Sequence, residues 1–415
     1  MNRFEPFREC LLGSRRAPAR QAPLTSRLPS FIGFRGDAEG ILRRLRVVLV
    51  GVGSVGMRIA EHFARLRVAE LWLVDPGHCS KPESVLTHPI SRPMTLPKAT
   101  YIARLCKRIS PETRVFAYVG LVQDLGPDAF ADAHLCVMAT DNLAAEIEFG
   151  RRCLALGKRL VHAALHGESL TIQVRVYTNT DGRGPCPACA FGAAERQQLA
   201  NQVHYSCEAG PSAHSTLRVT SPPTRSTSNL CALAADLGLN QAMRLVLGLG
   251  EPVGDTIMEY CGFTNRILTS SLARNPACRC DHTRYEVVPA PLPIRGYSFA
   301  RLVDEFMPPH GDANLTVTVG GAEWIECGLC RCAEPAAVRR FISKGRGTAG
   351  RCPRCQTVIH AQPLNSHEAV TAAMLGEAVT VPLSMLGVRK SPWALLRRAE
   401  TATLIRDPRR VLPLP

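Results

Sequence analysis

The sequence predicts an α/β protein built on a Rossmann-like, doubly wound sheet, and three observations support this. A short β-branched run at residues 46–50 leads into the glycine pattern G-x-G-x-x-G at residues 51–56 and then into an apolar-periodic stretch at residues 57–67. Strand-like and helix-like segments alternate from there to residue 177. At 415 residues the chain exceeds one typical domain, so a second unit is expected.

The first strand, turn and helix have the pattern of a phosphate site. Gly51, Gly53 and Gly56 carry no Cβ that would shield the backbone amides from an anion, and the start of the helix adds partial positive charge. Asp75 ends the next strand about twenty residues later, where a carboxylate accepts hydrogen bonds from ribose hydroxyls. We interpret this segment as a nucleotide-binding unit, with a glycine-rich turn that binds nothing as the alternative.

Two more charged residues stand at strand ends or helix starts of this unit. Lys98 opens a helix predicted at residues 98–109. A lysine there opposes the helix dipole, so a role facing phosphate groups is expected. Asp141 follows a strand predicted at residues 134–139, on the side of the sheet where ligands bind. Its carboxylate is suited either to a magnesium ion on a nucleotide or to ordinary helix capping.

Charge and cysteine content limit the classes of protein. The formal charge of +15 comes from arginines scattered without aromatic interleaving, which does not favour a nucleic-acid surface. No apolar run approaches the length of a membrane span, and the N-terminus lacks the apolar core of a signal peptide. Several of the 17 cysteines form C-x-x-C pairs, which indicates zinc in a reducing cytoplasm rather than secreted disulfides.

Two cysteine pairs frame the second half of the nucleotide unit. The run GPCPAC holds Cys186 and Cys189, and the run NPACRC holds Cys278 and Cys280. Four thiolates from two turns can form a tetrahedral structural zinc site, with a redox pair or unliganded core thiols as the alternative.

The chain between the pairs divides into a long polar loop and a helix. The loop spans residues 192–228 and holds Cys207 in the run YSCEAG. A helix is predicted at residues 229–247, with Asn229 as its cap.

A smaller unit follows a proline-rich boundary near residue 290. A helix is predicted at residues 299–306 and strands at residues 315–319, 393–398 and 401–406, which makes the unit α+β. Four of its cysteines follow C-x2-C-x21-C-x2-C, the spacing of a zinc ribbon. They are Cys327, Cys330, Cys352 and Cys355.

Taken in order, the motifs of the first unit resemble the ThiF/MoeB superfamily of adenylating enzymes, which includes the ubiquitin-activating enzymes. The resemblance covers about residues 25–285. The matching segments are VGVGSVG, the VD at Asp75, PKA at Lys98, ATDN at Asp141, GPCPAC, SCEAG, QAMRLVLGL and NPACRC.

This resemblance implies an activity and a site. It implies that ATP and Mg²⁺ bind and that the C-terminal glycine of a ubiquitin-like or sulfur-carrier protein is activated as an acyl-adenylate, usually before transfer to sulfur. It assigns the glycine turn to the phosphates, Asp75 to the ribose, Lys98 to the phosphates and Asp141 to magnesium and the attacking carboxylate. It further implies Zn²⁺ at the first four cysteines and matches Cys207 to the loop cysteine that forms a thioester in several members.

The chain departs from the family in one stretch. It reads ESVLTH, with Ser84 and Thr87, where the family pattern resembles ENLxRH and carries an Asn and an Arg. Arg92 is close enough in sequence to replace that arginine. Two alternatives to an activating enzyme therefore stand: a scaffold of the same fold with weakened catalysis, and an NAD-dependent oxidoreductase that shares only the glycine turn.

We divide the chain into a flexible basic N-terminal extension (residues 1–40), a ThiF/MoeB-like adenylation domain (41–290) and a zinc-ribbon-containing domain (291–415). The last is expected to dock the ubiquitin-like protein or a conjugating enzyme, or only to cap the structure. A bacterial, cytoplasmic homodimer without a membrane or nucleic-acid partner is the overall expectation.

Overall fold

The computed structural model forms two compact units, each with its own hydrophobic core. The first holds the described residues up to 282 except 126–131, and the second holds residues 126–131 and those from 283 onward. The residues that the structure describes are 8–9, 31, 34–78, 96–179, 184–193, 195–197, 226–308, 314–329, 335–343, 348–352, 354–361 and 366–407.

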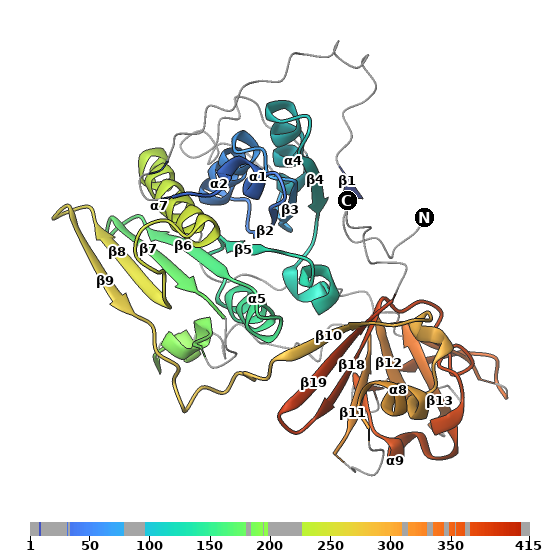
Figure 1. The fold of residues 1–415 in the computed structure, drawn as a ribbon. Coiled ribbons are helices and arrows are strands. Elements are labelled where there is room, and N and C mark those ends of the chain that lie inside the picture. Colours follow the sequence, from blue (N-terminus) through green and yellow to red (C-terminus); the bar gives the residue numbers. More distant parts are fainter. Residues whose placement is uncertain are drawn as a thin grey trace. The chain divides into compact units, whose positions relative to one another are not determined.

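A mixed sheet of nine strands forms the centre of the first unit (Figure 1), in the order β1-β4-β3-β2-β5-β6-β7-β8-β9. The strands from β4 to β6 are parallel, whereas β1 and β7 to β9 run antiparallel to their neighbours. The bounds are β1 (Arg8–Glu9), β2 (Arg46–Val50), β3 (Glu70–Val74), β4 (Arg114–Tyr118), β5 (Leu135–Met138), β6 (Leu160–His166), β7 (Thr171–Tyr177), β8 (Thr256–Cys261) and β9 (Arg266–Ser271).

Helices cover both faces of the parallel half of this sheet. In Figure 1, α2, α4 and α7 lie on one side of it and α5 lies on the other. The α-helices of this unit are α1 (Ala38–Leu42), α2 (Ser54–Arg65), α4 (Lys98–Ile109), α5 (Leu143–Ala155) and α7 (Ser228–Leu247). Short 3₁₀ turns occupy Val122–Asp124 and Pro187–Ala190.

Burial on both faces explains the apolar runs of the central strands. β2 and β5 are buried along almost their whole length, and α2 places Phe63 in the same core. α7 is long and apolar enough to span a membrane by length and composition, whereas no apolar run of that length was expected. It packs against α2 and β6 within this unit. Its N-cap is Thr227, so the predicted cap Asn229 lies inside the helix.

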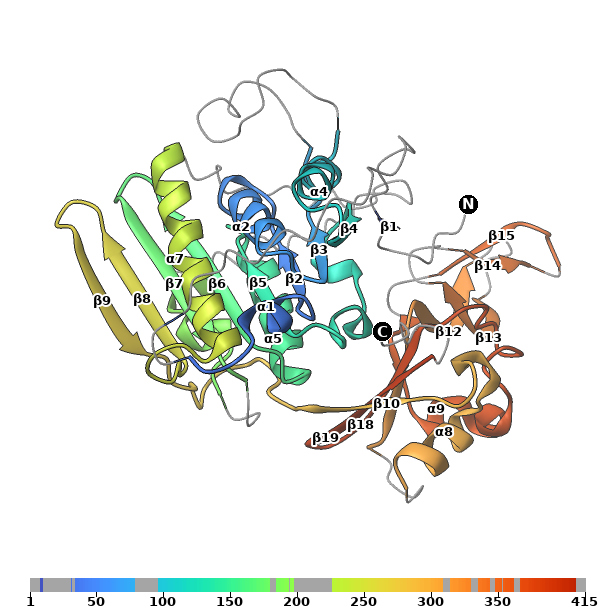
Figure 2. The same ribbon diagram turned by 45° about the horizontal axis from the view of Figure 1, so that its top comes forward.

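The antiparallel strands β8 and β9 form a ribbon at one edge of the sheet (Figure 2). β8 is half-buried throughout and β9 is exposed throughout. The sheet is thus an extended mixed sheet rather than a purely parallel one.

The second unit contains two smaller sheets of five strands each. The first has the order β10-β19-β18-β11-β17, and in the second β13-β12-β15-β14 pair in that order while β16 also pairs with β12. The hydrophobic core of the second unit includes three large aromatic side chains, Trp324, Tyr297 and Phe341. The strands are β10 (Tyr285–Pro289), β11 (Thr316–Val319), β12 (Ala322–Leu329), β13 (Pro335–Ser343), β14 (Thr348–Arg351), β15 (Val358–Ala361), β16 (Ser366–His367), β17 (Ala369–Val370), β18 (Trp393–Arg398) and β19 (Thr401–Arg406).

Two short helices accompany these sheets, and their bounds are α8 (Phe299–Phe306) and α9 (Ala372–Leu375). The serine at the N-cap of α8, Ser298, accepts a hydrogen bond from the backbone N–H of Arg301, which explains where this helix begins.

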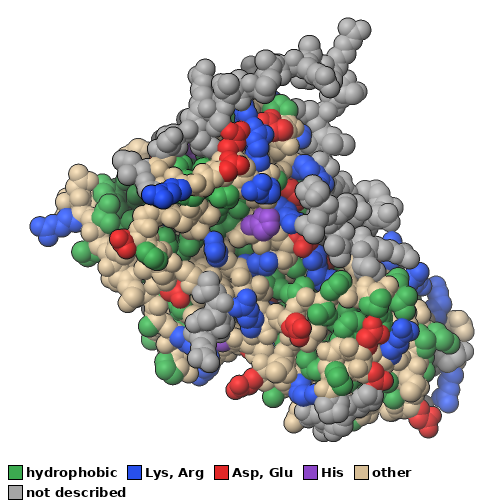
Figure 3. Space-filling view, viewed as in Figure 1, with side chains coloured by type: hydrophobic (Ala, Val, Ile, Leu, Met, Phe, Trp, Pro, Cys, Tyr) green, Lys and Arg blue, Asp and Glu red, His purple; other side chains and the backbone are tan. Residues whose placement is uncertain are grey.

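Charged side chains are distributed over the face of the molecule seen in Figure 3. Lys and Arg side chains lie there with acidic and hydrophobic side chains between them. This distribution agrees with the scattered arginines of the sequence.

Candidate functional site

The glycine turn joins β2 to α2 at the carboxyl end of β2. Gly51 has a φ of 84°, and a Cβ there would lie 2.5 Å from the carbonyl oxygen of Ala139 at the end of β5. A Cβ on Gly56 would collide with the Gly51 carbonyl, so α2 can begin only against a bare turn. Within the described part of the chain, a Cβ on Gly53 would meet no atom within 4 Å. Two of the glycines therefore make the turn possible, and the third faces open space that a phosphate can occupy.

Asp75 is the residue directly after β3, and its carboxylate organises the neighbouring backbone. Oδ2 accepts a hydrogen bond from the Val52 N–H at 2.8 Å, and Oδ1 accepts one from the Gly77 N–H at 2.7 Å. The residue is only 8% exposed. Each oxygen keeps a second lone pair, so the carboxylate can still accept a hydrogen bond from a ribose hydroxyl.

Lys98 is the first residue of α4 and lies beside the same loop. Its N–H donates to the Gly77 carbonyl at 2.9 Å, and a Cβ added to Gly77 would meet the Lys98 side chain at 3.3 Å. The first turn of α4 contains no acidic residue. The ammonium group is thus the charged group of this helix start, although a cation is disfavoured there by the helix dipole.

Asp141 follows β5 and is exposed, whereas its neighbour Asn142 caps α5. The Asn142 side chain accepts a hydrogen bond from the Ala145 N–H at 2.9 Å. The capping role that the sequence left open for Asp141 is therefore filled by Asn142. Among the described residues, no hydrogen bond to the Asp141 carboxylate is present, which leaves it available to a cation.

These groups converge because β2, β3 and β5 are neighbours in the sheet. The chain runs from β2 outward to β3 and β4 and then returns to β5 on the other side of β2. That reversal is the switch point at which α/β sheets bind ligands, outside the carboxyl ends of the strands. Four residues singled out from the sequence lie outside the described residues: Cys207, Ser84, Thr87 and Arg92.

Glu146 lies on α5, five residues after Asp141, and was not among the residues predicted from the sequence. It occupies the first turn of α5 and is buried, and burial raises the pKa of its carboxyl group to about 7. The Arg175 guanidinium opposes that rise in pKa and the Asp141 charge adds to it. Glu146 and Asp141 therefore lie within electrostatic reach of one another.

A second cluster brings together three of the predicted zinc ligands. Donor atoms of Cys186, Cys189, Cys278 and His282 all lie within 4.8 Å of one another. The Cys186 sulfur is 3.8 Å from that of Cys189 and 3.7 Å from that of Cys278, and the Cys189 sulfur is 3.6 Å from His282 Nε2. Tetrahedral zinc would set about 3.8 Å between two sulfurs and about 3.5 Å between sulfur and nitrogen. The cluster thus fits a tetrahedral metal ion.

The fourth member of this group differs from the sequence-based set. Cys280 packs against the cluster and hydrogen-bonds with the Cys186 side chain, which lowers the pKa of Cys280, but it does not belong to the group of four donors. His282 takes that place. The run NPACRCDH shows this histidine in the same turn, so the signal was present but the C-x-C pair was preferred.

The cysteines of the C-terminal unit do not form such a group among the described residues. Cys327 lies on β12, Cys352 and Cys355 lie in the turn between β14 and β15, and Cys330 is outside the described residues. Cys352 packs with isoleucine side chains in a small core. The zinc ribbon remains a prediction.

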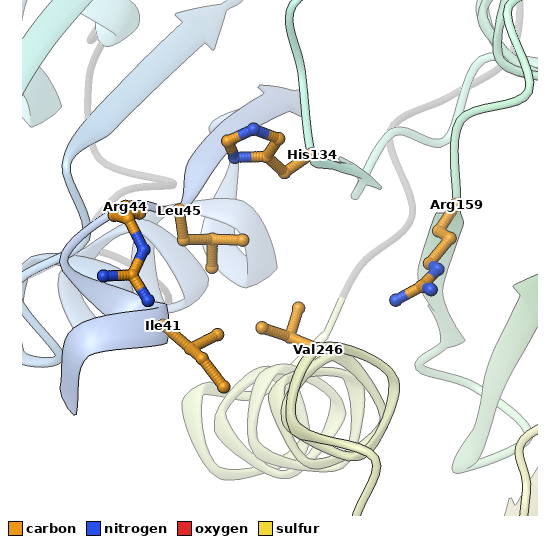
Figure 4. Close-up of a pocket in the computed structure, with 6 residues that line it drawn as sticks. All are labelled: Ile41, Arg44, Leu45, His134, Arg159 and Val246. Carbon is orange, nitrogen blue, oxygen red and sulfur yellow. The ribbon is translucent and has the colours of Figure 1, made fainter. Parts of the chain in front are cut away.

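A separate pocket of about 250 Å³ opens at the opposite ends of the strands of the large sheet (Figure 4). It is close to the amino ends of β2, β5 and β6, and none of the predicted site residues lines it. Its lining residues are Ile41, Arg44, Leu45, His134, Arg159 and Val246.

Comparison with known proteins places this fold and site in a family. The model of the ThiF family matches residues 27–281. The chain belongs to the ThiF family. The match spans the glycine turn, Asp75, Lys98, Asp141 and most of the cysteine and histidine cluster, and it ends before residue 283, where the main part of the second unit begins.

Two of the similar relatives are named as adenylyltransferases and a third as an activating enzyme. Molybdopterin-synthase adenylyltransferase of Escherichia coli K12 is 27% identical over 59% of this chain and 90% of its own length. Sulfur carrier protein adenylyltransferase of Thermus thermophilus is 24% identical over 58% of this chain and 84% of its own length. The SAMP-activating enzyme E1 of Haloferax volcanii is 25% identical over 58% of this chain and 82% of its own length.

Among solved structures, a crystal structure of E. coli MccB with ATP matches at 15% identity and a TM-score of 0.45. It covers 59% of this chain and 68% of the other. A likeness of this degree carries no argument about function.

The metal cluster predicts opposite results for two substitutions. We expect His282→Ala to lower zinc affinity at least tenfold, because one of four ligands is lost, and Cys280→Ser to keep one equivalent of zinc. The measurement is zinc content after dialysis against a chelator, with the Co²⁺ absorption spectrum of each variant as a second readout. Retention by His282→Ala together with loss by Cys280→Ser would show that Cys280 is the fourth ligand.

The raised pKa of Glu146 predicts a pH-dependent stability. The folded state binds this proton more tightly than the unfolded state, so the corresponding stability is present below about pH 4.5 and is lost as the pH rises through about 7. The loss amounts to at most about 3 kcal/mol. Glu146→Gln cannot titrate, so its free energy of unfolding should fall less between pH 5 and pH 8 than that of the wild type. Parallel curves from urea denaturation would contradict the assignment.

Proposed function

We propose that this chain is an ATP- and Mg²⁺-dependent adenylyltransferase that activates the C-terminal glycine of a ubiquitin-like or sulfur-carrier protein. The observation that carries the proposal is the convergence of the glycine turn, Asp75, Lys98 and Asp141 at the carboxyl ends of three adjacent strands. The names of the family relatives support the class of reaction.

The chemistry required matches the groups at the site. A carboxylate is a poor acyl donor, and making pyrophosphate the leaving group solves this problem. The backbone amides of the turn would bind phosphate, and the Lys98 ammonium would neutralise negative charge that grows on the leaving group. Asp75 would orient the ribose. Asp141 would hold Mg²⁺, which when bound supplies further positive charge to the phosphates.

Three further parts of the proposal rest on the sequence. Cys207 would attack the acyl carbon of the acyl-adenylate as a thiolate, so that a thioester forms, the acyl–phosphate bond breaks and AMP leaves. The enzyme would work as a cytoplasmic homodimer. The second unit would dock the carrier protein or a conjugating enzyme.

Pyrophosphate exchange tests the proposal. With a small β-grasp carrier protein that ends in glycine, we expect the wild type to exchange labelled pyrophosphate into ATP. Lys98→Ala and Asp141→Ala should each lower the rate about 100-fold, the usual cost of removing one group that stabilises transition-state charge. Arg104→Ala, an exposed cation on the same helix as Lys98, is the matched control and should leave the rate unchanged.

Two results would go against this proposal. Exchange that survives both substitutions would remove the assigned roles. A wild-type protein that binds ATP but exchanges no pyrophosphate with any carrier would favour the catalytically weakened scaffold.

A further inference from the structure

A layer of polar side chains lies buried between α5 and the strands β6 and β7, directly behind Asp141. Glu146 comes from α5, His162 from β6, and Arg175 and Tyr177 from β7. Glu146 is 5% exposed, and His162 and Tyr177 are each 1% exposed. This layer belongs to none of the roles assigned above.

The layer is held by weak contacts and is costly for stability. Glu146 Oε1 is 3.7 Å from His162 Nε2, and Glu146 Oε2 is 3.7 Å from Arg175 Nη1. Glu146 Oε2, Arg175 Nε and the Tyr177 hydroxyl are buried without a hydrogen-bond partner among the described residues. Each buried polar group without a partner costs about 1–3 kcal/mol, so apolar residues would make a more stable layer.

The layer contacts the chain on both sides of Asp141. Glu146 lies in the first turn of α5, one turn after the cap Asn142. His162 lies beside the end of β5, where its backbone pairs with Met138, and both of its ring nitrogens are buried without a hydrogen-bond partner among the described residues. The layer therefore draws on α5, which follows Asp141, and on β6, which pairs with the strand that precedes Asp141.

Arg175 is oriented by a chain of hydrogen bonds that starts elsewhere in the sheet. Its Nη2 donates to Gln173 Oε1 at 2.6 Å, and the Gln173 amide donates to Glu259 on β8 at 2.7 Å. The guanidinium is thus fixed relative to the sheet rather than relative to α5. Its attraction for Glu146 restrains the start of α5 on the sheet.

We propose that Glu146 and Arg175 are positioning residues that fix the turn at Thr140–Asn142 and thereby aim the Asp141 carboxylate into the crevice. The inference rests on the proposed function, because it concerns the residue to which the metal role is given there. It assigns a purpose to a layer that stability alone does not explain.

Binding of Mn²⁺, the probe for the Asp141 site, tests this inference without any carrier protein. Mn²⁺ affinity would be measured by electron paramagnetic resonance on the full chain with a non-hydrolysable ATP analogue. Arg175→Met and Glu146→Asp should each weaken Mn²⁺ binding about tenfold, as removal of groups that orient a metal ligand does. The double variant should bind Mn²⁺ about as tightly as the single variant with the lower Mn²⁺ affinity, because the two residues act as one unit.

The signs of the effects separate positioning from simple charge. If only charge acted through space, loss of the Arg175 cation would strengthen cation binding, and Glu146→Asp, which keeps a carboxyl group, would change little. Arg114→Met is the matched control, because it breaks an ion pair with Glu70 in the same sheet at 2.9 Å. It should leave Mn²⁺ affinity unchanged.

Each outcome decides something. Affinity equal to or above that of the wild type in Arg175→Met, with Asp141→Asn weakened, would overturn the inference and leave the proposed function standing. Absence of Mn²⁺ binding in the wild type would overturn both. Should Arg175→Met fail to fold, Glu146→Asp decides alone, and unchanged affinity there would overturn the inference.

Discussion

The structure of the first unit depends on the close approach of the turn after β2 to the end of β5. Gly51 lies so close to the Ala139 carbonyl, and Gly56 so close to the Gly51 carbonyl, that neither position has room for a side chain. Because the turn is bare, α2 starts directly after it, with Gly53 as an N-cap that offers no side-chain hydrogen bond to the first amides of the helix. Asp75 then ties the same turn to β3 by accepting the Val52 N–H.

Asp141 and Asn142 have different roles in this arrangement. A helix that starts at the carboxyl edge of the sheet needs a cap, and Asn142 supplies it. The adjacent carboxylate is therefore not used in capping. Lys98 lies at a helix start that disfavours a cation, and a bound phosphate would remove that cost.

Local sequence patterns predicted several elements of both units. The strand at residues 46–50 and the helices at residues 98–109 and 299–306 coincide with β2, α4 and α8. Their buried faces leave a clear apolar pattern. α2 begins three residues before the predicted start, at Ser54, because the glycine pattern extends into the helix itself. β8 and β9 were missed because their side chains are half-buried or exposed, so no alternation marks them.

The site was predictable where the chemistry is local and not where it depends on the fold. The glycine turn, Asp75, Lys98 and Asp141 each carry a local signal beside a strand or a helix. Glu146 and Arg175 are 29 positions apart and meet only because α5 lies over β7. His282 was passed over because two thiols in the same turn gave a stronger signal for zinc.

The proposed activity requires that a phosphate of ATP binds in the open space beside Gly53. Isothermal titration of ATP with Mg²⁺ into Gly53→Val tests this most directly. A Cβ at this position meets no atom of the described residues within 4 Å, so the variant should fold with nearly wild-type stability. The account predicts that it loses ATP affinity at least 100-fold. Undiminished ATP affinity in the folded variant would contradict the claim.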